Sequence, residues 1–262
     1  MAWDFEPNNM SNNFTRSGRI GGGSQGIYAE SSVARYPIGY ALEFDDGRKF
    51  RYGYFSAAVN RSCLVATDIS TTGVVETDNI ATAAAVGDTT VILTDAGTLG
   101  SAALNQYGGA YLHITTDTGA SGAGYIYRIK SSSAASANAV TFILYDPLIA
   151  ALTTASDIAI TGNLYDELKI YEPAVDVLVA GVTMINVTAA YYAWIQTRGV
   201  ANILADVSAG TVTIGAPSQY SDGVNGAVQP FDGVGDLEDT CGPFLFVPDT
   251  TGYVGVQLRI GD

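Results

Sequence analysis

The sequence predicts an all-β protein with two β-sandwich or barrel-like lobes and an extended N-terminal arm. Only 15% of the residues are charged and 30 are glycine, a composition that suits strands and tight turns better than exposed helices. Short apolar runs also alternate with turns rich in Gly, Ser and Asn between residues 86 and 171, as they do in sandwiches and barrels. A chain of 262 residues is long enough to bury such cores without disulfides.

Residues 1–27 are predicted to form the arm. This stretch is rich in asparagine and contains the run Gly21–Gly23, so it cannot bury enough apolar surface to build a core. Three aromatic residues nevertheless lie in it, Trp3, Phe5 and Phe14. Aromatic side chains dominate interface energies once they are desolvated, so we expect them to anchor the arm on a neighbouring subunit. A terminus that is merely disordered is the alternative.

The strands on either side of the block at residues 86–171 are predicted to form one domain. Two alternating runs on either side of the Asp-Gly pair at 46–47 indicate a hairpin. We therefore expect a main β domain from residues 28–75 and 172–262. An inserted β lobe is expected from residues 76–171, interrupted by a short helix or turn at DPLIAALTTA.

The most apolar strand of the main domain is YYAWIQTRGVANILAD, residues 191–206. Its alternate residues are apolar or aromatic on both sides, so both faces should be covered. Trp194 is expected to lie in the core or to be buried between protomers. Gly199 indicates a bulge or a close backbone approach. Arg198 is predicted to be an interfacial or bulge-stabilising cation, with a plain surface position as the alternative.

The charge of the chain disfavours nucleic acid and anionic membranes as partners. The 12 Lys and Arg residues face 26 Asp and Glu residues, which gives a net charge of −14, whereas phosphate binding depends on clustered cations. The cations of the hairpin, which lie among aromatic residues, have acids across the turn that can pair with them. No apolar run approaches the roughly 20 residues that span a bilayer, and the first residues do not resemble a secretory signal.

No motif in the sequence predicts an enzyme, a metal site or a cofactor site. His113 lies alone in a strand-like run without a second metal ligand nearby. Cys63 and Cys241 are too few for a disulfide framework and are expected to be buried thiols. The densest acidic cluster does not fit the pattern of a calcium-binding loop. The spacing of its carboxylates in the sequence gives no evidence for a glycosidase. It is expected to be a solvated loop. Its members are Asp232, Asp236, Glu238 and Asp239.

Five segments in order resemble the head decoration, or cement, proteins of tailed bacteriophages. They are YPIGYALEFDDGRKFRYGYF, GDTTVILTDAGTL with the GGAYLHITT and GYIYRIKSS runs, VTFILYDPL, YYAWIQTRGVANILAD and GYVGVQLRIGD. The fourth segment approaches a tract of the form GYxxVQTxGPxxVLxD, with Val200 in place of the usual proline and Tyr191 in place of the usual glycine.

The resemblance implies a β-rich structural protein of the virion that stabilises an assembled capsid. Such a protein is made in the host cytoplasm, is often a homotrimer, and binds the major capsid protein on the outer surface where capsid subunits meet. It has no catalytic site, cofactor or nucleic-acid partner. The alternatives are a tail spike or fibre protein, although the chain shows no fixed-period repeat, and a carbohydrate-binding protein, because a fold does not determine a function.

Overall fold

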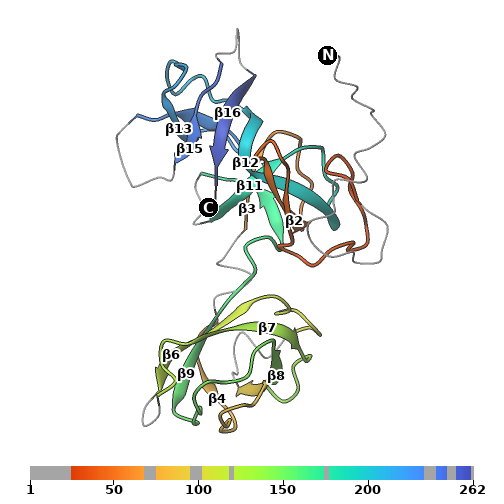
Figure 1. Ribbon diagram of the computed structural model, residues 1–262, viewed down its shortest axis with the longest axis vertical. Coiled ribbons are helices and arrows are strands. Elements are labelled where there is room, and N and C mark those ends of the chain that lie inside the picture. Colours follow the sequence, from red (N-terminus) through yellow and green to blue (C-terminus); the bar gives the residue numbers. More distant parts are fainter. Residues whose placement is uncertain are drawn as a thin grey trace.

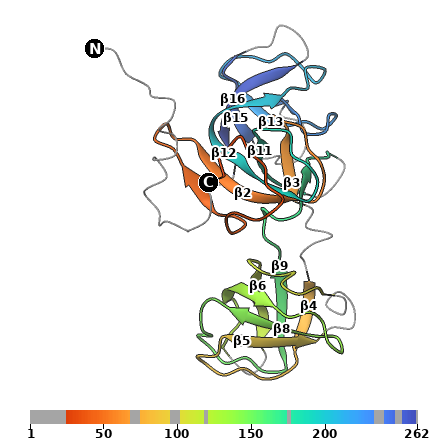
Figure 2. The same ribbon diagram turned by 90° about the vertical axis from the view of Figure 1, so that its right-hand side faces the viewer.

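The computed structural model describes residues 25–67, 75–94, 102–117, 121–173, 177–232, 240–246 and 252–260. These residues form strands, turns and isolated bridges, with no helix among them. The predicted all-β fold class is therefore confirmed. The DPLIAALTTA segment, for which a helix or a turn was expected, contains bends, a turn and an isolated bridge of Leu152 to Ala84. Figures 1 and 2 show two lobes, one of which is a separate barrel.

The barrel is a closed circuit of six antiparallel strands in the order β4-β5-β8-β7-β6-β9. Side chains alternate along each strand, so one set fills the interior and the other faces outward. The interior holds one apolar core that includes Leu112, Ile129 and Phe142. The strands are β4 (Val75–Ile80), β5 (Thr90–Thr94), β6 (Tyr111–Asp117), β7 (Ile126–Ser132), β8 (Ala139–Leu144) and β9 (Ser156–Thr161).

The larger lobe contains a seven-stranded sheet in the order β1-β2-β10-β3-β11-β12-β16. A further pairing of β2 with β12 closes a ring of five strands, β2-β10-β3-β11-β12. A three-stranded sheet, β14-β13-β15, packs beside β16. The strands are β1 (Ala41–Glu43), β2 (Lys49–Phe55), β3 (Leu64–Thr67), β10 (Leu168–Ile170), β11 (Leu178–Thr183), β12 (Tyr191–Leu204), β13 (Pro217–Tyr220), β14 (Val228–Pro230), β15 (Thr240–Pro243) and β16 (Tyr253–Arg259).

The larger lobe is built from strands that precede the barrel in the sequence and from strands that follow it. β1 and β2 form the expected hairpin around Asp46-Gly47, with Leu42 opposite Phe50. β10 lies in the ring, where it pairs with β2 and β3. The range 76–171 expected for the inserted lobe is therefore too long at its C-terminal end. A strand of only three residues has too short a pattern to show which strands it pairs with.

An aromatic layer covers the outer side of the ring where β2 meets β12. Trp194 is 1% exposed and packs against Tyr36, Tyr40 and Tyr52. Gln25 completes this layer: its Nε2 donates to two backbone carbonyls, its Oε1 accepts from the Tyr52 hydroxyl at 2.6 Å, and its own carbonyl accepts from Trp194 Nε1 at 3.0 Å. Every polar group of this buried amide side chain is satisfied.

The position of Gln25 corrects the extent of the predicted arm. Gln25 and Ile27 are 6% and 8% exposed, so they belong to the core of the larger lobe although both lie within residues 1–27. A single Gln and a single Ile among glycines carry no periodic pattern, so the sequence alone does not reveal that they are buried. Trp3, Phe5 and Phe14 lie outside the described residues.

Candidate interaction surface

The outward side of the β12–β16 pair is exposed, and we name it the β12–β16 face. The inward side of the same pair is buried, with Ala201, Ile203, Val254 and Val256 in one core. Because residues directly opposite each other in an antiparallel pair share a side, the alternate residues of both strands line the outer side. The face comprises Arg198, Val200 and Asn202 of β12, Tyr253, Gln257 and Arg259 of β16, and the adjoining Leu245 and Phe246.

One end of the face is a row of cations across three strands. Arg198 of β12 lies opposite Lys49 of β2 on one side and opposite Arg259 of β16 on the other. Together with Arg48, these residues make up four of the 12 cations in a chain of net charge −14. Like charges directly opposite each other destabilise a sheet, so an anionic partner would favour this arrangement.

The charges near this row are only partly neutralised. Arg48 Nε lies 2.7 Å from a carboxylate oxygen of Asp46, and Lys49 Nζ lies 3.9 Å from Glu43. Arg259 forms no ion pair within the described parts of the chain. The row therefore keeps positive charge that a partner can contact.

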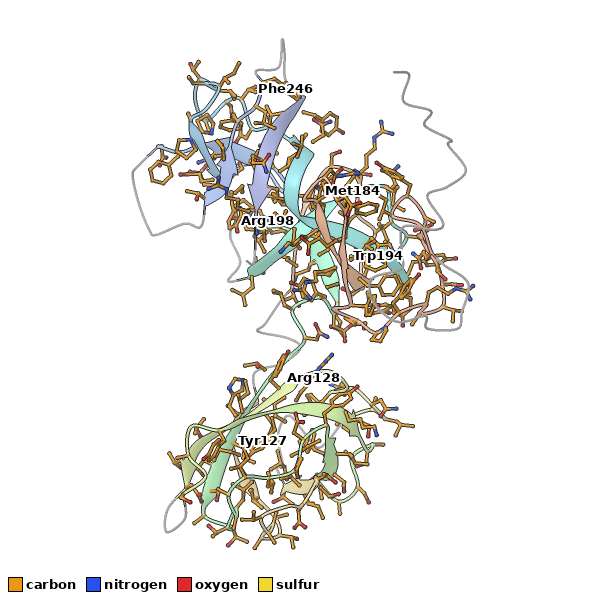
Figure 3. The ribbon with its side chains drawn as sticks, in the orientation of Figure 1. Tyr127, Arg128, Met184, Trp194, Arg198 and Phe246 are labelled. Carbon is orange, nitrogen blue, oxygen red and sulfur yellow. The ribbon has the colours of Figure 1, made fainter. Side chains whose placement is uncertain are left out.

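The other end of the face is apolar. Phe246 is 46% exposed and Tyr253 40%, and Val200, which is 59% exposed, lies between them and the cation row. The Phe246 ring lies over Gly255, where a Cβ would come within 2.5 Å of the ring, so this glycine provides the space that seats the aromatic side chain. Figure 3 shows Phe246 and Arg198 at different positions along the β12–β16 pair. Arg and aromatic side chains together are the composition typical of interface hot spots.

A β-bulge positions Arg198 on this face. The register between β12 and β2 shifts between Gln196 and Arg198, and Gly199 has a φ of +90°. The Gln196 amide holds the bulge by donating from Nε2 to the carbonyls of Arg198 at 2.9 Å and Val200 at 3.0 Å. A Cβ on Gly199 would lie 2.8 Å from Arg48 Cγ. The predicted bulge and the predicted close approach are both confirmed.

The structure brings Arg198 together with Lys49 and Arg259, which were not among the predicted site residues. Lys49 comes from the hairpin. Arg259 comes from the last strand, about 60 residues after Arg198 in the sequence. Only the pairing of β12 with both strands places them in one row. The outward position of Arg259 in the alternating VGVQLRI run was the one signal available.

Trp194, the other predicted interface candidate among the described residues, lies in the core of the single chain.

Cys63 and Cys241 are buried free thiols, and burial raises the pKa of the Cys63 thiol. His113 lies on the outside of the barrel with its Nε2 2.7 Å from Thr161 Oγ1. No three His, Cys, Asp or Glu side chains in the described residues are grouped to hold a metal.

The predicted acidic loop is only partly described. Asp232 lies at the end of a described segment, while Asp236, Glu238 and Asp239 lie outside the described residues.

In the parts of the chain that the structure describes, no helix is long and apolar enough to cross a membrane.

A small pocket of about 90 Å³ lies between the barrel and the segment that returns to the larger lobe. It is lined by Tyr107 and Gly108 of the barrel and by Asn163, Asp166 and Glu167 of the returning segment. Burial raises the pKa of Asp166 to about 6, and the neighbouring Glu167 carboxylate adds to this, although a hydrogen bond from the Glu167 amide opposes it. Ionisation of Asp166 therefore costs more free energy in the folded chain than in the unfolded chain, which lowers stability at neutral pH.

The variant Asp166→Asn is expected to be more stable than the wild type at pH 7.5, by about 1 to 2 kcal/mol, since Asp166 is only half-buried and solvent reduces the effect. A pKa raised above its unfolded value means that the folded state binds the proton more tightly, so wild-type stability falls as pH rises from about 4 to above 6. Urea unfolding of both proteins at pH 4 and pH 7.5 measures this. A difference that does not grow with pH would contradict the assignment.

Comparison of the chain with known protein families, with curated proteins and with solved structures found no match.

Proposed function

We propose that this protein is a structural component of a phage virion that binds the outer surface of the assembled capsid and stabilises it. The β12–β16 face carries this proposal, because it presents arginines at one end and exposed aromatic side chains at the other end of one strand pair. The order of short β motifs, which resembles that of head decoration proteins, agrees with it. The major capsid protein is the proposed partner and the virion the proposed location.

The mechanism is mass action on the shell. A subunit that binds only the assembled lattice stabilises that lattice by its binding free energy at each site. If the protein acts as a homotrimer, linkage of three copies raises the effective concentration for the second and third contacts, so weak individual contacts suffice. The net charge of −14 fits an outward position, away from packaged DNA. Trp3, Phe5 and Phe14 are proposed to anchor the arm on neighbouring subunits.

The test is reversal of charge on the β12–β16 face. Shells from a phage that lacks this gene are mixed with purified protein, and bound copies are counted after sedimentation. Wild-type protein is expected to saturate at a fixed number of copies per shell. The double variant Arg198→Glu/Arg259→Glu is expected to bind at least about tenfold more weakly, because it replaces two attractions by two repulsions at the contact.

The matched control is Arg35→Glu/Arg61→Glu, which makes the same change in net charge at two other exposed positions of the larger lobe. It should bind shells as the wild type does. Thermal unfolding of both variants verifies that each is folded. Wild-type protein that fails to bind shells would exclude the proposed function, and equal losses in the two variants would exclude the β12–β16 face as the contact surface.

A further inference from the structure

The barrel carries a second exposed surface, separate from the β12–β16 face. Tyr111 of β6 lies opposite Arg128 of β7, and the Tyr145 amide donates to the Arg128 carbonyl at 3.0 Å, so the three residues form a row across β6, β7 and the end of β8. Ile126 and Ile143 are exposed on the same side. We name the surface of Tyr111, Ile126, Arg128, Lys130, Ile143 and Tyr145 the barrel face.

Both cations of the barrel lie on this face. Within residues 75–161, Arg128 and Lys130 are the only Lys or Arg residues. Both point outward from β7, whose inward side chains, Tyr127 and Ile129, are buried. In the described residues neither cation forms an ion pair. The acidic residues of the same range are Glu76, Asp78, Asp88, Asp95, Asp117, Asp146 and Asp157.

Arg128 is oriented by an aromatic ring. Its Cζ lies 5.2 Å from the centroid of the Tyr145 ring, a cation–π contact that fixes the side chain. This contact uses the charge of the planar group and leaves its fork of N–H donors available to a carboxylate. Figure 3 shows Arg128 on the outside of the barrel, while Tyr127, its neighbour in sequence, points into the interior.

The surroundings of Arg128 select the class of partner. Two cations in an acidic lobe are too few for the phosphates of nucleic acid or an anionic membrane, which bind clusters of cations. The exposed tyrosines and isoleucines instead match the apolar side chains of a protein. The circuit of β4 to β9 is closed, so a partner strand has no edge to pair with and must bind through side chains.

We propose that the barrel face binds an acidic polypeptide segment of another protein. One carboxylate binds Arg128 in a bidentate geometry, a second binds near Lys130, and apolar side chains of the segment cover Ile126, Ile143 and Tyr145. This proposal does not depend on capsid binding, because the face lies on the other lobe and its residues take no part in the β12–β16 face.

The test uses the full chain and a fluorescent, glutamate-rich peptide of about 12 residues that includes leucines. Fluorescence anisotropy is expected to show binding that weakens with salt, and a peptide with glutamine in place of glutamate should not bind. Arg128→Glu/Lys130→Glu should weaken binding at least about tenfold. Arg128→Lys, which keeps the charge and the fold, should weaken it several-fold because lysine lacks the bidentate fork.

Arg35→Glu/Arg61→Glu again controls for net charge and should bind the peptide as the wild type does. Four results would overturn the proposal: no binding of the glutamate-rich peptide, equal binding by the Arg128→Glu/Lys130→Glu variant, an equal loss in the control, or tighter binding of this face to a DNA duplex or to phosphatidylserine vesicles. Self-association that the Arg128→Glu/Lys130→Glu variant abolishes would also overturn it, because the face would then belong to a contact between copies of this chain.

Discussion

Gly242→Ala is expected to lower the free energy of unfolding by about 4 kcal/mol, since it combines a strained backbone with overpacking against a second strand. Gly242 has a φ of +126°, which L side chains rarely adopt. A methyl group there would overlap the carbonyl oxygen of Gln257 and lie 2.9 Å from its carbonyl carbon. Both atoms belong to the backbone of β16. The steric overlap is therefore relieved only if β15 moves away from β16.

Urea unfolding of the wild type and the variant measures this loss. Gly215→Ala is the matched control, because Gly215 also has a positive φ, +83°, but a Cβ there meets nothing within 4 Å. It should cost only about 1 to 2 kcal/mol, the strain term alone. Equal losses in the two variants would show that the approach of β15 to β16 contributes nothing.

Removal of residues 1–27 is expected to destabilise the larger lobe by about 3 to 5 kcal/mol, whereas removal of residues 1–24 should leave its stability nearly unchanged. The longer truncation deletes Gln25, so the Trp194 indole N–H and the Tyr52 hydroxyl both lose their hydrogen-bond acceptors in a buried layer. It also removes Ile27 from the core. Thermal and urea unfolding of the two truncated proteins measure the difference.

Gln25→Ala in the full chain separates these contributions. It keeps the backbone carbonyl that accepts from Trp194 but removes the side-chain oxygen that accepts from the Tyr52 hydroxyl, so its loss should fall between those of the two truncations, at about 2 kcal/mol. Equal stability of the two truncated proteins would contradict the role of Gln25. The protein without residues 1–24 is also the suitable reagent for capsids, where loss of the proposed arm should reduce retention without unfolding the lobe.

Local patterns in the sequence predicted local structure well. Alternation and the Asp-Gly pair identified the β1–β2 hairpin, and a lone glycine in an apolar strand identified the bulge beside Gly199. The close approach of the hairpin follows from the glycine itself, because a side chain there would collide with Arg48. Such features depend on neighbours in sequence or on one close contact.

Local patterns did not show which strands pair when the strands lie far apart in the sequence. β5 pairs with β8 across two intervening strands, and β10 is too short to show which strands it joins. The cation row of Lys49, Arg198 and Arg259 depends on two such pairings. Arg198 could therefore be singled out from its strand, but the surface that it belongs to could not.

The separation of the cores has a consequence for synthesis on the ribosome. Every residue of the barrel core lies between Ile80 and Ile160, so the barrel can fold as soon as β9 has emerged, whereas β2 must wait for β12 before its ring closes. Domains generally fold as units in the order in which they are made, and contacts between distant strands form slowly. We expect the middle of the chain to fold first, while the aromatic residues of β2 stay exposed to chaperones until the last third has been translated.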